Sequence, residues 1–259
     1  MNQLKEKILA KQKTIGTIVD LCDTCVSDIF SRLGYDYLWV DYEHSYLSLE
    51  NILNHTAVAQ ANGTSVVVRV PQYDFSATKK VLEMGVDGII FPMIKSAKEA
   101  KELIDFTLYP PEGTRGFGPM AANQYGLIDA KTYVKEANRS ICRFVQIECV
   151  EIIDQLDELM ENPYIDGYIF GPNDLSGSLG EFLNVYEGKT AEVMKAAIKK
   201  LKDNGKYVGI ATGANQKEVV AHWNDMGADM LCAGCDYVFL LQGAKTLAET
   251  MRAVQKETL

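Results

Sequence analysis

The sequence predicts a (β/α)8 barrel, and three observations support this fold class. Eight short apolar runs are spread along the 259 residues. A segment with helical spacing of apolar residues follows each run, and strands that alternate with helices form parallel sheets. Eight such units in about 250 residues give the strand number and the length of a (β/α)8 barrel. A doubly wound open sheet is the alternative, but no G-x-G-x-x-G motif follows the first run and the sequence has no P-loop.

The predicted strands are nearly continuous apolar runs, as expected for parallel strands that are buried on both faces. They lie at residues 14–19, 37–42, 64–70, 88–93, 142–148, 167–171, 207–212 and 229–234. A glycine or polar turn that contains an aspartate precedes four of them, as in Gly34-Tyr35-Asp36 and Gly227-Ala228-Asp229. Such a turn ends a helix and begins the next strand.

The segments between the strands have the spacing of amphipathic helices, for example around Ile52 and Ala196. The first residues, 1–13, lack the uninterrupted apolar region of a signal peptide and predict a short surface helix. The longest irregular stretch spans residues 108–127, and an insertion of this length is usually a functional loop. No linker or change of composition divides the chain, so we expect residues 1–259 to form one barrel domain.

The composition limits the partners of the protein. Lys and Arg number 26 against 35 Asp and Glu, which gives a formal charge of −9. This sign argues against nucleic acids and anionic membranes, whose phosphates bind Lys and Arg. It is compatible with a small anionic substrate, because one arginine or a metal ion can reverse the potential inside a cleft. No apolar run approaches the roughly 20 residues that cross a bilayer, so we expect a cytoplasmic protein.

Six cysteines include two C-x-x-C pairs, which raise the question of a zinc site. They are Cys22, Cys25, Cys142, Cys149, Cys232 and Cys235. Disulfides are not expected in a reducing cytosol. The last pair lies in a predicted strand, where residues three apart point to opposite faces. We therefore expect buried free thiols, with a four-cysteine zinc site as the alternative.

Polar residues follow four predicted strands at their carboxyl ends, where the active sites of parallel barrels lie. These residues are Asp41, Glu43 and His44 after the second strand, Arg69 on the third, Gln146 and Glu148 on the fifth, and Asn173 and Asp174 after the sixth. Gln146 and Glu148 are two apart, so they project on the same face of their strand. Burying such groups costs several kcal/mol unless they are paired or bind a metal.

Two of these residues, Glu148 and Asp174, are candidate metal ligands because their strands are neighbours in an eight-stranded barrel. Two hard oxygen ligands suit Mg²⁺ or Mn²⁺ better than structural zinc. Such a site also leaves positions for water and a chelating substrate. The alternative is that these carboxylates only cap loops and helix N-termini, which Asp174 is placed to do.

The roles of His44 and Arg69 are also open to two interpretations each. His44 lies at a strand end beside two carboxylates and could act as an acid or base, whereas His55 and His222 lie in helical segments, where a surface or core-edge role is expected. Arg69 closes a valine-rich run and should hold an anion or oxyanion, or else a structural ion pair.

Taken together, the ordered motifs resemble the HpcH/HpaI aldolase family of metal-dependent pyruvate aldolases, such as 2,4-dihydroxyhept-2-ene-1,7-dioate aldolase. The resemblance runs from about Gly16 to Phe239. The motifs that carry it are Val40-Asp41-Tyr42-Glu43-His44, Val68-Arg69-Val70-Pro71, Tyr109-Pro110-Pro111-Glu112-Gly113-Thr114-Arg115-Gly116, Val145-Gln146-Ile147-Glu148 and Gly171-Pro172-Asn173-Asp174-Leu175-Ser176. The family implies a TIM barrel of the phosphoenolpyruvate/pyruvate type.

The resemblance also implies a role for each site residue. Glu148 and Asp174 would bind Mg²⁺ or Mn²⁺, with Co²⁺ as a further candidate. His44 would be the acid/base, acting through a bound water, and Glu83 its acidic partner. The remaining implied contacts are Arg69 to the keto or enolate oxygen, Gln146 and the amides near Asn173 and Asp174 to pyruvate, and Asp41 to the metal's water.

Two departures from the family pattern leave the acceptor aldehyde open. Ile18 stands where several members carry a tryptophan, and Ala211 stands near the mouth where some relatives have a larger apolar residue. The implied reaction joins pyruvate, as an enolate held by the metal, to an aldehyde, and the reverse reaction cleaves a 4-hydroxy-2-oxo acid. The resemblance further implies a homo-oligomer, a hexamer or trimer of dimers.

Three alternatives to this function remain at the level of the sequence. A Schiff-base aldolase would need a desolvated lysine, for which Lys95 is the nearest candidate. A CoA-ester lyase of the citrate lyase β-subunit or citramalyl-CoA type would need a basic groove, which the acidic composition does not favour. A non-catalytic binding barrel would not need the intact set of His44, Arg69, Glu148 and Asp174.

Overall fold

A computed structural model describes residues 2–257 and contains a closed barrel of eight parallel strands. Each strand pairs with its sequence neighbours, and β8 pairs with β1 to close the barrel. The strands are β1 Thr14–Val19, β2 Tyr37–Asp41, β3 Ser65–Arg69, β4 Gly88–Phe91, β5 Cys142–Ile147, β6 Gly167–Phe170, β7 Val208–Thr212 and β8 Met230–Cys235. The predicted (β/α)8 fold is confirmed, and each predicted strand overlaps the observed one to within about two residues at either end.

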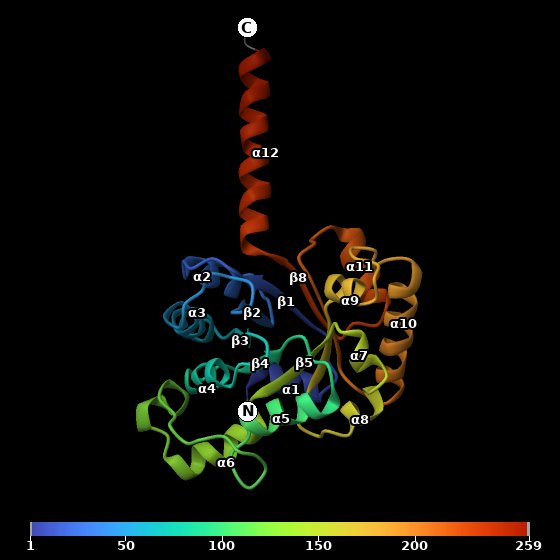
Figure 1. Cartoon of the computed structure of the whole chain (residues 1–259). Helices are drawn as coiled ribbons and strands as arrows, with labels where there is room; N and C mark the ends of the chain where they lie inside the picture. The colour runs from blue at the N-terminus through green and yellow to red at the C-terminus, as the bar shows by residue number, and fades with distance from the viewer. Residues whose placement is uncertain (1, 258–259) are drawn as a thin grey trace.

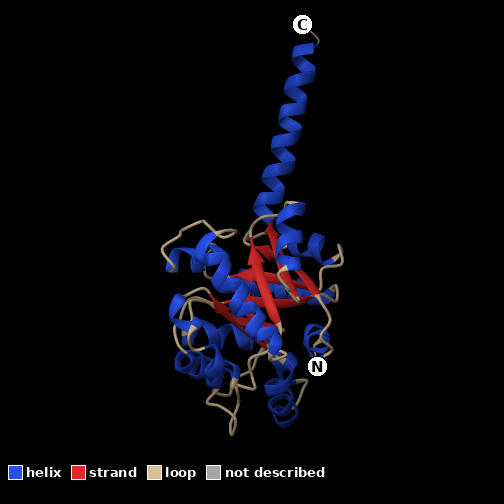
Figure 2. Ribbon diagram, turned by 90° about the vertical axis from the view of Figure 1, so that its right-hand side faces the viewer, coloured by secondary structure: helices blue, strands red, loops and turns tan. Residues whose placement is uncertain are grey.

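Helices surround the barrel and connect its strands (Figures 1 and 2). They are α1 Gln3–Leu9, α2 Cys25–Ser31, α3 Leu49–Ala61, α4 Phe75–Glu83, α5 Ala97–Thr107, the 3-10 helix η1 Ala121–Gly126, α6 Ala130–Ser140, α7 Val150–Ile153, α8 Leu156–Met160, α9 Pro172–Ser178, α10 Gly188–Asp203, α11 Lys217–Asp225 and α12 Asp236–Glu257. Among residues 2–257, no helix combines the length and the apolarity that a membrane span requires.

The aspartates of the recurring turns fix the register of the barrel at its amino end. Before β2, the Asp36 backbone N–H donates to the Ile15 carbonyl of β1 at 2.9 Å, and the Ile15 N–H donates back to Asp36 Oδ2 at 2.7 Å. The same reciprocal pair joins Asp87 to Val66, Asp166 to Arg143, and Asp229 to Val208. Each even-numbered strand is therefore tied to the odd-numbered strand before it, which is the physical reason for the repeat in the sequence.

The first helix, α1, closes the amino end of the barrel. Leu4 is fully buried and Ile8 is 3% exposed, and both pack with residues of the barrel interior. The Lys5 ammonium forms an ion pair with Asp166. Figure 1 shows this end of the barrel on the side away from α12. The predicted surface helix is thus wrong, because the i, i+4 pair Leu4 and Ile8 faces the open mouth of the barrel.

The last helix, α12, leaves the barrel and projects away from it (Figures 1 and 2). Outward-facing residues of β2 to β7 are buried under helices, as Val66 and Val208 are. On β1 and β8, by contrast, Ile15 is 50% exposed and Leu231 is only partly buried. The flank over β1 and β8 therefore lacks the helix that covers the other strands.

The irregular stretch 108–127 lies at the amino end, between α5 and α6. Its Arg115 is 3% exposed, lies over the Tyr109 ring at 4.5 Å and contacts the Tyr133 hydroxyl at 3.1 Å. No residue of this stretch lines the large cavity at the other end of the barrel. Within one chain this stretch does not reach the cavity, so its role as a functional loop stays a prediction.

The six cysteines are all free thiols. Cys142, Cys149, Cys232 and Cys235 are buried, as expected, whereas Cys22 and Cys25 are exposed in the connection from β1 to α2. The prediction of buried thiols is therefore wrong for Cys22 and Cys25. These two residues follow the carboxyl end of β1, where the chain turns outward over the surface.

Candidate active site

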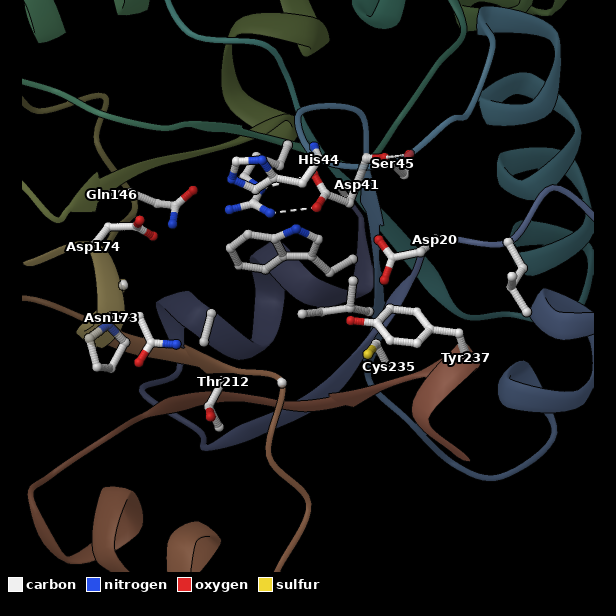
Figure 3. A pocket seen from close by; sticks show the side chains of 18 of the residues that line it. Asp20, Asp41, His44, Ser45, Gln146, Asn173, Asp174, Thr212, Cys235 and Tyr237 are labelled. Carbon is white, nitrogen blue, oxygen red and sulfur yellow. Dashed lines mark hydrogen bonds and ion pairs between the residues drawn. The ribbon is translucent and has the colours of Figure 1, made fainter. Parts of the chain in front are cut away.

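A cavity of about 660 Å³ opens at the carboxyl ends of the strands (Figure 3). Its walls come from seven of the eight strand ends or the loops that follow them. The lining residues are Ile18, Asp20, Leu21, Trp39, Asp41, His44, Ser45, Tyr46, Arg69, Gln146, Gly171, Pro172, Asn173, Asp174, Ala211, Thr212, Gly213, Cys235 and Tyr237. Seven of the predicted site residues are among them, and Glu148 lies behind Gly171 and Gln146.

Arg69 is held by Asp41 on the neighbouring strand. The two residues are register partners in the pairing of β2 with β3, so their side chains leave adjacent strand ends together. Arg69 Nε lies 3.0 Å from Asp41 Oδ1, and a second hydrogen bond joins Nη2 to Oδ2. The guanidinium also lies 5.4 Å from the centroid of the Trp39 ring. Arg69 is thus a fixed cation at the cavity wall, so the structural ion pair and a substrate contact are compatible.

His44 lies in the loop after β2, with its side chain 66% exposed. Asp41 Oδ1 accepts a hydrogen bond from the Glu43 N–H at 3.0 Å and a longer one from the His44 N–H at 3.4 Å. The carboxylate near the imidazole is that of Glu43, whose Oε2 lies 3.7 Å from His44 Nε2 and 3.3 Å from Arg69 Nη1. Burial raises the pKa of Glu43, and the Arg69 charge opposes this shift.

Glu83 is not brought to this site within one chain. It is the last residue of α4, which runs from the carboxyl end of β3 back to the amino end of β4, and its Oε1 lies 3.5 Å from Arg115 Nη2. The expected pair of His44 and Glu83 would require Glu83 of a second copy. Within one chain the direction of α4 separates Glu83 from His44, whereas Glu43, which directly precedes His44 in the sequence, lies beside the imidazole.

Glu148 follows β5 and is only 2% exposed. Its Oε1 accepts a hydrogen bond from the Met93 N–H at 2.6 Å, and its Oε2 accepts one from Gln146 Nε2 at 2.9 Å. Burial raises the pKa of Glu148 to about 7, with a further contribution from the charge of Asp174. A Cβ at Gly171 would lie 2.3 Å from Glu148 Oε2, so only glycine leaves room for this carboxylate.

Asp174 and Asn173 lie in the first turn of α9, which starts directly after β6 and carries Pro172 at its first position. Both side chains are exposed to the cavity. The residue at the N-cap is Gly171, and no side chain caps this helix. The capping alternative for Asp174 is therefore not supported, and its carboxylate is free to bind a ligand.

The donor set at this end of the cavity fits a hard divalent cation. Glu148 and Asp174 supply two carboxylates, and within residues 2–257 no group of three or more His, Cys, Asp or Glu side chains could hold a metal. The buried Gln146 Oε1 has no hydrogen-bond partner among the described residues, and burial, which raises the pKa of Glu148, disfavours its negative charge. A cation would compensate both features, with the remaining ligands supplied by water or substrate.

Several cavity residues were not among the predicted site residues. Asp20 directly follows the first strand, so the rule that found Asp41 and Arg69 could have found it too. Nothing in the sequence marked Trp39 and Tyr237 as site residues, because aromatic residues are common in hydrophobic cores. Lys95, the candidate for a Schiff base, is exposed and lacks the desolvation that such a lysine needs.

Comparison with known proteins agrees with this geometry. The model of the HpcH/HpaI aldolase/citrate lyase family matches residues 19–239. The chain is 31% identical to hydroxypyruvate/pyruvate aldolase from Roseovarius nubinhibens, with 96% of both chains covered. It is 28% identical to 4-hydroxy-2-oxo-heptane-1,7-dioate aldolase from Klebsiella pneumoniae, covering 95% of this chain and 92% of the relative. The crystal structure of an HpcH/HpaI aldolase from Desulfitobacterium hafniense superposes with a TM-score of 0.89 at 28% identity, over 97% of both chains. The chain belongs to the HpcH/HpaI aldolase/citrate lyase family.

Proposed function

We propose that the protein is a carbon–carbon lyase that cleaves a 4-hydroxy-2-oxo acid to pyruvate and an aldehyde, and catalyses the reverse addition. The observation that carries this proposal is the convergence on one cavity of a fixed arginine and two carboxylates that fit a divalent cation. The named relatives are aldolases of 2-oxo acids. The acidic composition argues against nucleic acids and anionic membranes as partners, so we propose a small-molecule substrate. We also propose a cytoplasmic location.

Glu148 and Asp174 would hold the cation, Mg²⁺ or Mn²⁺, with Co²⁺ as a further candidate. When bound, the cation supplies Lewis acidity that polarises a carbonyl group. The chain's own contribution is to orient Glu148 through the Met93 N–H and to keep space for it at Gly171.

Arg69 stabilises the negative charge that develops on the 2-oxo oxygen when the bond between C3 and C4 breaks. Because Asp41 accepts hydrogen bonds from two N–H groups on one edge of the guanidinium, little reorganisation is needed as the charge forms. Gln146 and the backbone amides near Asn173 and Asp174 bind the pyruvate unit. Ala211 and Ile18 leave the wall near the acceptor wide.

His44 moves the proton. In cleavage, the 4-hydroxyl proton is removed as the bond breaks, and C3 receives a proton to become the methyl group of pyruvate. His44 performs these transfers through water, because its exposed ring has access to solvent and Glu43 lies beside it. A role for Glu83 in this step depends on a second copy of the chain.

The test is exchange of the pyruvate methyl protons with D2O, followed by NMR, together with aldehyde-dependent consumption of pyruvate. We expect both with Mg²⁺ or Mn²⁺ restored to EDTA-treated protein, and neither without metal. Glu148→Gln and Asp174→Asn should abolish both, whereas Glu151→Gln, an exposed glutamate on α7, should retain them. Full metal-dependent turnover of Glu148→Gln would show that the ligand assignment is wrong.

The alternative activities find less support in this cavity. Among the described lining residues, Arg69 is the only Lys or Arg, so nothing here provides the basic groove that a CoA ester needs. A binding barrel without catalysis would show no turnover in the same assay.

We further propose that the protein is a homo-oligomer in which α12 packs on the uncovered flank of a second copy. Leu240, Ala244, Leu247 and Met251 recur every three or four residues on one face of α12, and the three large side chains are 57–65% exposed. Exposed apolar surface of this kind marks an interface. The flank over Ile15 and Leu231 lacks a covering helix, so a helix from a second copy would bury both surfaces.

Analytical ultracentrifugation tests the assembly. We expect the wild-type chain to sediment as a multiple of its 28.8 kDa mass, and Leu247→Glu combined with Met251→Glu to give monomers. Lys245→Glu, on the far face of α12, should leave the assembly intact. A monomeric wild-type chain at micromolar concentration would contradict the proposal. The number of copies, expected as a hexamer or trimer of dimers, follows from the same measurement.

A further inference from the structure

Asp20 lies in the cavity at the end away from the proposed metal ligands. In Figure 3, Asp20 and Tyr237 lie on one side, and Gln146, Asn173 and Asp174 lie on the other. If the pyruvate unit binds beside Glu148 and Asp174, as proposed above, the carbon chain of the acceptor aldehyde extends toward Asp20. The side chains at the Asp20 end of the cavity would therefore determine which aldehyde binds as acceptor.

The charges at this end are unbalanced toward the negative. Asp20 and Asp41 both line the cavity. Among the described lining residues Arg69 is the only Lys or Arg, and it is already paired with Asp41. Within residues 2–257 the Asp20 carboxylate accepts no hydrogen bond. Burial raises the pKa of Asp20 to about 7, and the charges of Asp41 and Asp236 add to this shift. Above pH 7 the ionised Asp20 carboxylate is therefore an acceptor without a donor among the described residues.

The position of Asp20 is fixed by its backbone. The N–H groups of Asp20 and Leu21 both donate to Asp236 Oδ2 at 2.9 Å, and Asp236 is only 3% exposed. The side chain of Asp20 therefore projects into the cavity from a loop whose backbone is held in place by Asp236. The neutral hydroxyl group of Tyr237 lies at the same end of the cavity (Figure 3).

We propose that Asp20 is a specificity-determining residue that selects an uncharged hydroxyaldehyde as acceptor. The hydroxyl on the carbon next to the aldehyde donates a hydrogen bond to the Asp20 carboxylate. In the cleavage direction, the substrate is then a 4,5-dihydroxy-2-oxo acid. The bond chemistry is unchanged: the pyruvate methyl carbon loses a proton and joins the aldehyde carbon, whose C=O double bond becomes single, and the former aldehyde oxygen takes up a proton as the 4-hydroxyl.

The same residue disfavours acceptors that carry a carboxylate. A second negative charge near Asp20 would meet Asp41 as well, and among the described lining residues the only Lys or Arg is Arg69, which Asp41 already binds. An aldehyde with a methyl group in place of the hydroxyl would leave Asp20 without a donor while removing its access to water. A hydrogen bond to a charged group of this kind changes rates by about tenfold or more.

The experiment compares kcat/KM for glycolaldehyde, for propanal, which has the same number of heavy atoms, and for succinic semialdehyde, each with pyruvate and Mn²⁺. We expect the wild-type enzyme to prefer glycolaldehyde over each of the others by about tenfold or more. Asp20→Ala should bring the glycolaldehyde-to-propanal ratio close to one. Asp20→Asn should raise the semialdehyde-to-glycolaldehyde ratio by about tenfold, because it removes the charge and keeps the size. Asp23→Asn, an exposed aspartate three residues along the same loop, should leave both ratios unchanged.

The outcomes separate this inference from the proposed function. If the wild-type protein does not exchange the methyl protons of pyruvate, the proposed function itself is contradicted. If exchange and aldol addition occur but the Asp20 variants keep the wild-type ratios, only the assignment of Asp20 is overturned. A wild-type preference for succinic semialdehyde, or for a cationic aminoaldehyde over glycolaldehyde, would overturn it as well. Ratios within one variant do not depend on the amount of folded enzyme, so partial misfolding cannot imitate the expected result.

Discussion

Replacing Glu148 by glutamine should stabilise the metal-free protein while destroying the site. The carboxylate is 2% exposed, and burial raises its pKa from the usual 4.5 to about 7. The folded state therefore holds a proton that the unfolded chain releases, and stability falls as the pH rises from about 4.5 to 7. At 1.36 kcal/mol per pKa unit, the full cost above pH 7 is about 3 kcal/mol. The amide is neutral at every pH and avoids this cost.

The local hydrogen bonds also tolerate the amide. Its oxygen can still accept from the Met93 N–H. Its NH2 group can donate to Gln146 Oε1, which has no partner in the wild-type chain, after the Gln146 amide turns over. The change in stability should therefore come mainly from the charge, and it should disappear at low pH, where wild-type Glu148 is protonated in both states.

Urea denaturation of EDTA-treated protein at pH 5 and pH 8 measures the effect. We expect Glu148→Gln to be more stable than wild type by about 3 kcal/mol at pH 8 and by less than about 1 kcal/mol at pH 5. Glu151→Gln should show no difference at either pH. Saturating Mn²⁺ should reverse the order, because only the wild-type site gains binding energy. An equal difference at both pH values, or a variant less stable than wild type at pH 8, would refute the buried-charge argument.

Three further predictions follow from the contacts described above. Gly171→Ala should lower kcat by about 100-fold or more, because the added Cβ would displace Glu148. Gly118→Ala should not lower kcat, because a Cβ there meets no atom within 4 Å. Isothermal titration with Mn²⁺ should show the same contrast between the two variants. Arg69→Lys should reduce kcat by about 100-fold with an unchanged circular dichroism spectrum, since lysine cannot keep both hydrogen bonds to Asp41, and a wild-type rate would contradict the role assigned to it. Asp166→Ala should cost about 2–4 kcal/mol in urea denaturation, because it leaves Lys5 and the Arg143 N–H unpaired, whereas the exposed Asp157→Ala should cost little.

The strands were predictable because each is a short apolar run that begins after a recognisable turn. The positions of Arg69, Gln146 and Glu148 at the strand ends followed from that pattern. The destinations of α1 and α12 did not, because an amphipathic helix carries no local record of which apolar surface it covers. Leu4 and Ile8 pack with residues of the barrel interior as distant in sequence as Cys232.

The role of Glu83 stays a prediction for a similar reason. The family resemblance implies it, but within one chain helix α4 carries Glu83 to the opposite end of the barrel, and one sequence does not give the position of a second copy. Asp20 could have been found, because it follows a strand end as Asp41 does. The role proposed for Asp20 depends on the pairing of Arg69 with Asp41, which only the three-dimensional arrangement shows.

The reciprocal aspartate pairs have a consequence for engineering. They hold the strand pairs at one mouth of the barrel, while the chemistry takes place at the other. A library that randomises the loops around Asp20 and Ala211 would leave every one of these pairs untouched. New acceptor preferences could thus be selected in this scaffold with little loss of foldability, since the residues that align the strands and the residues that choose the aldehyde are different sets.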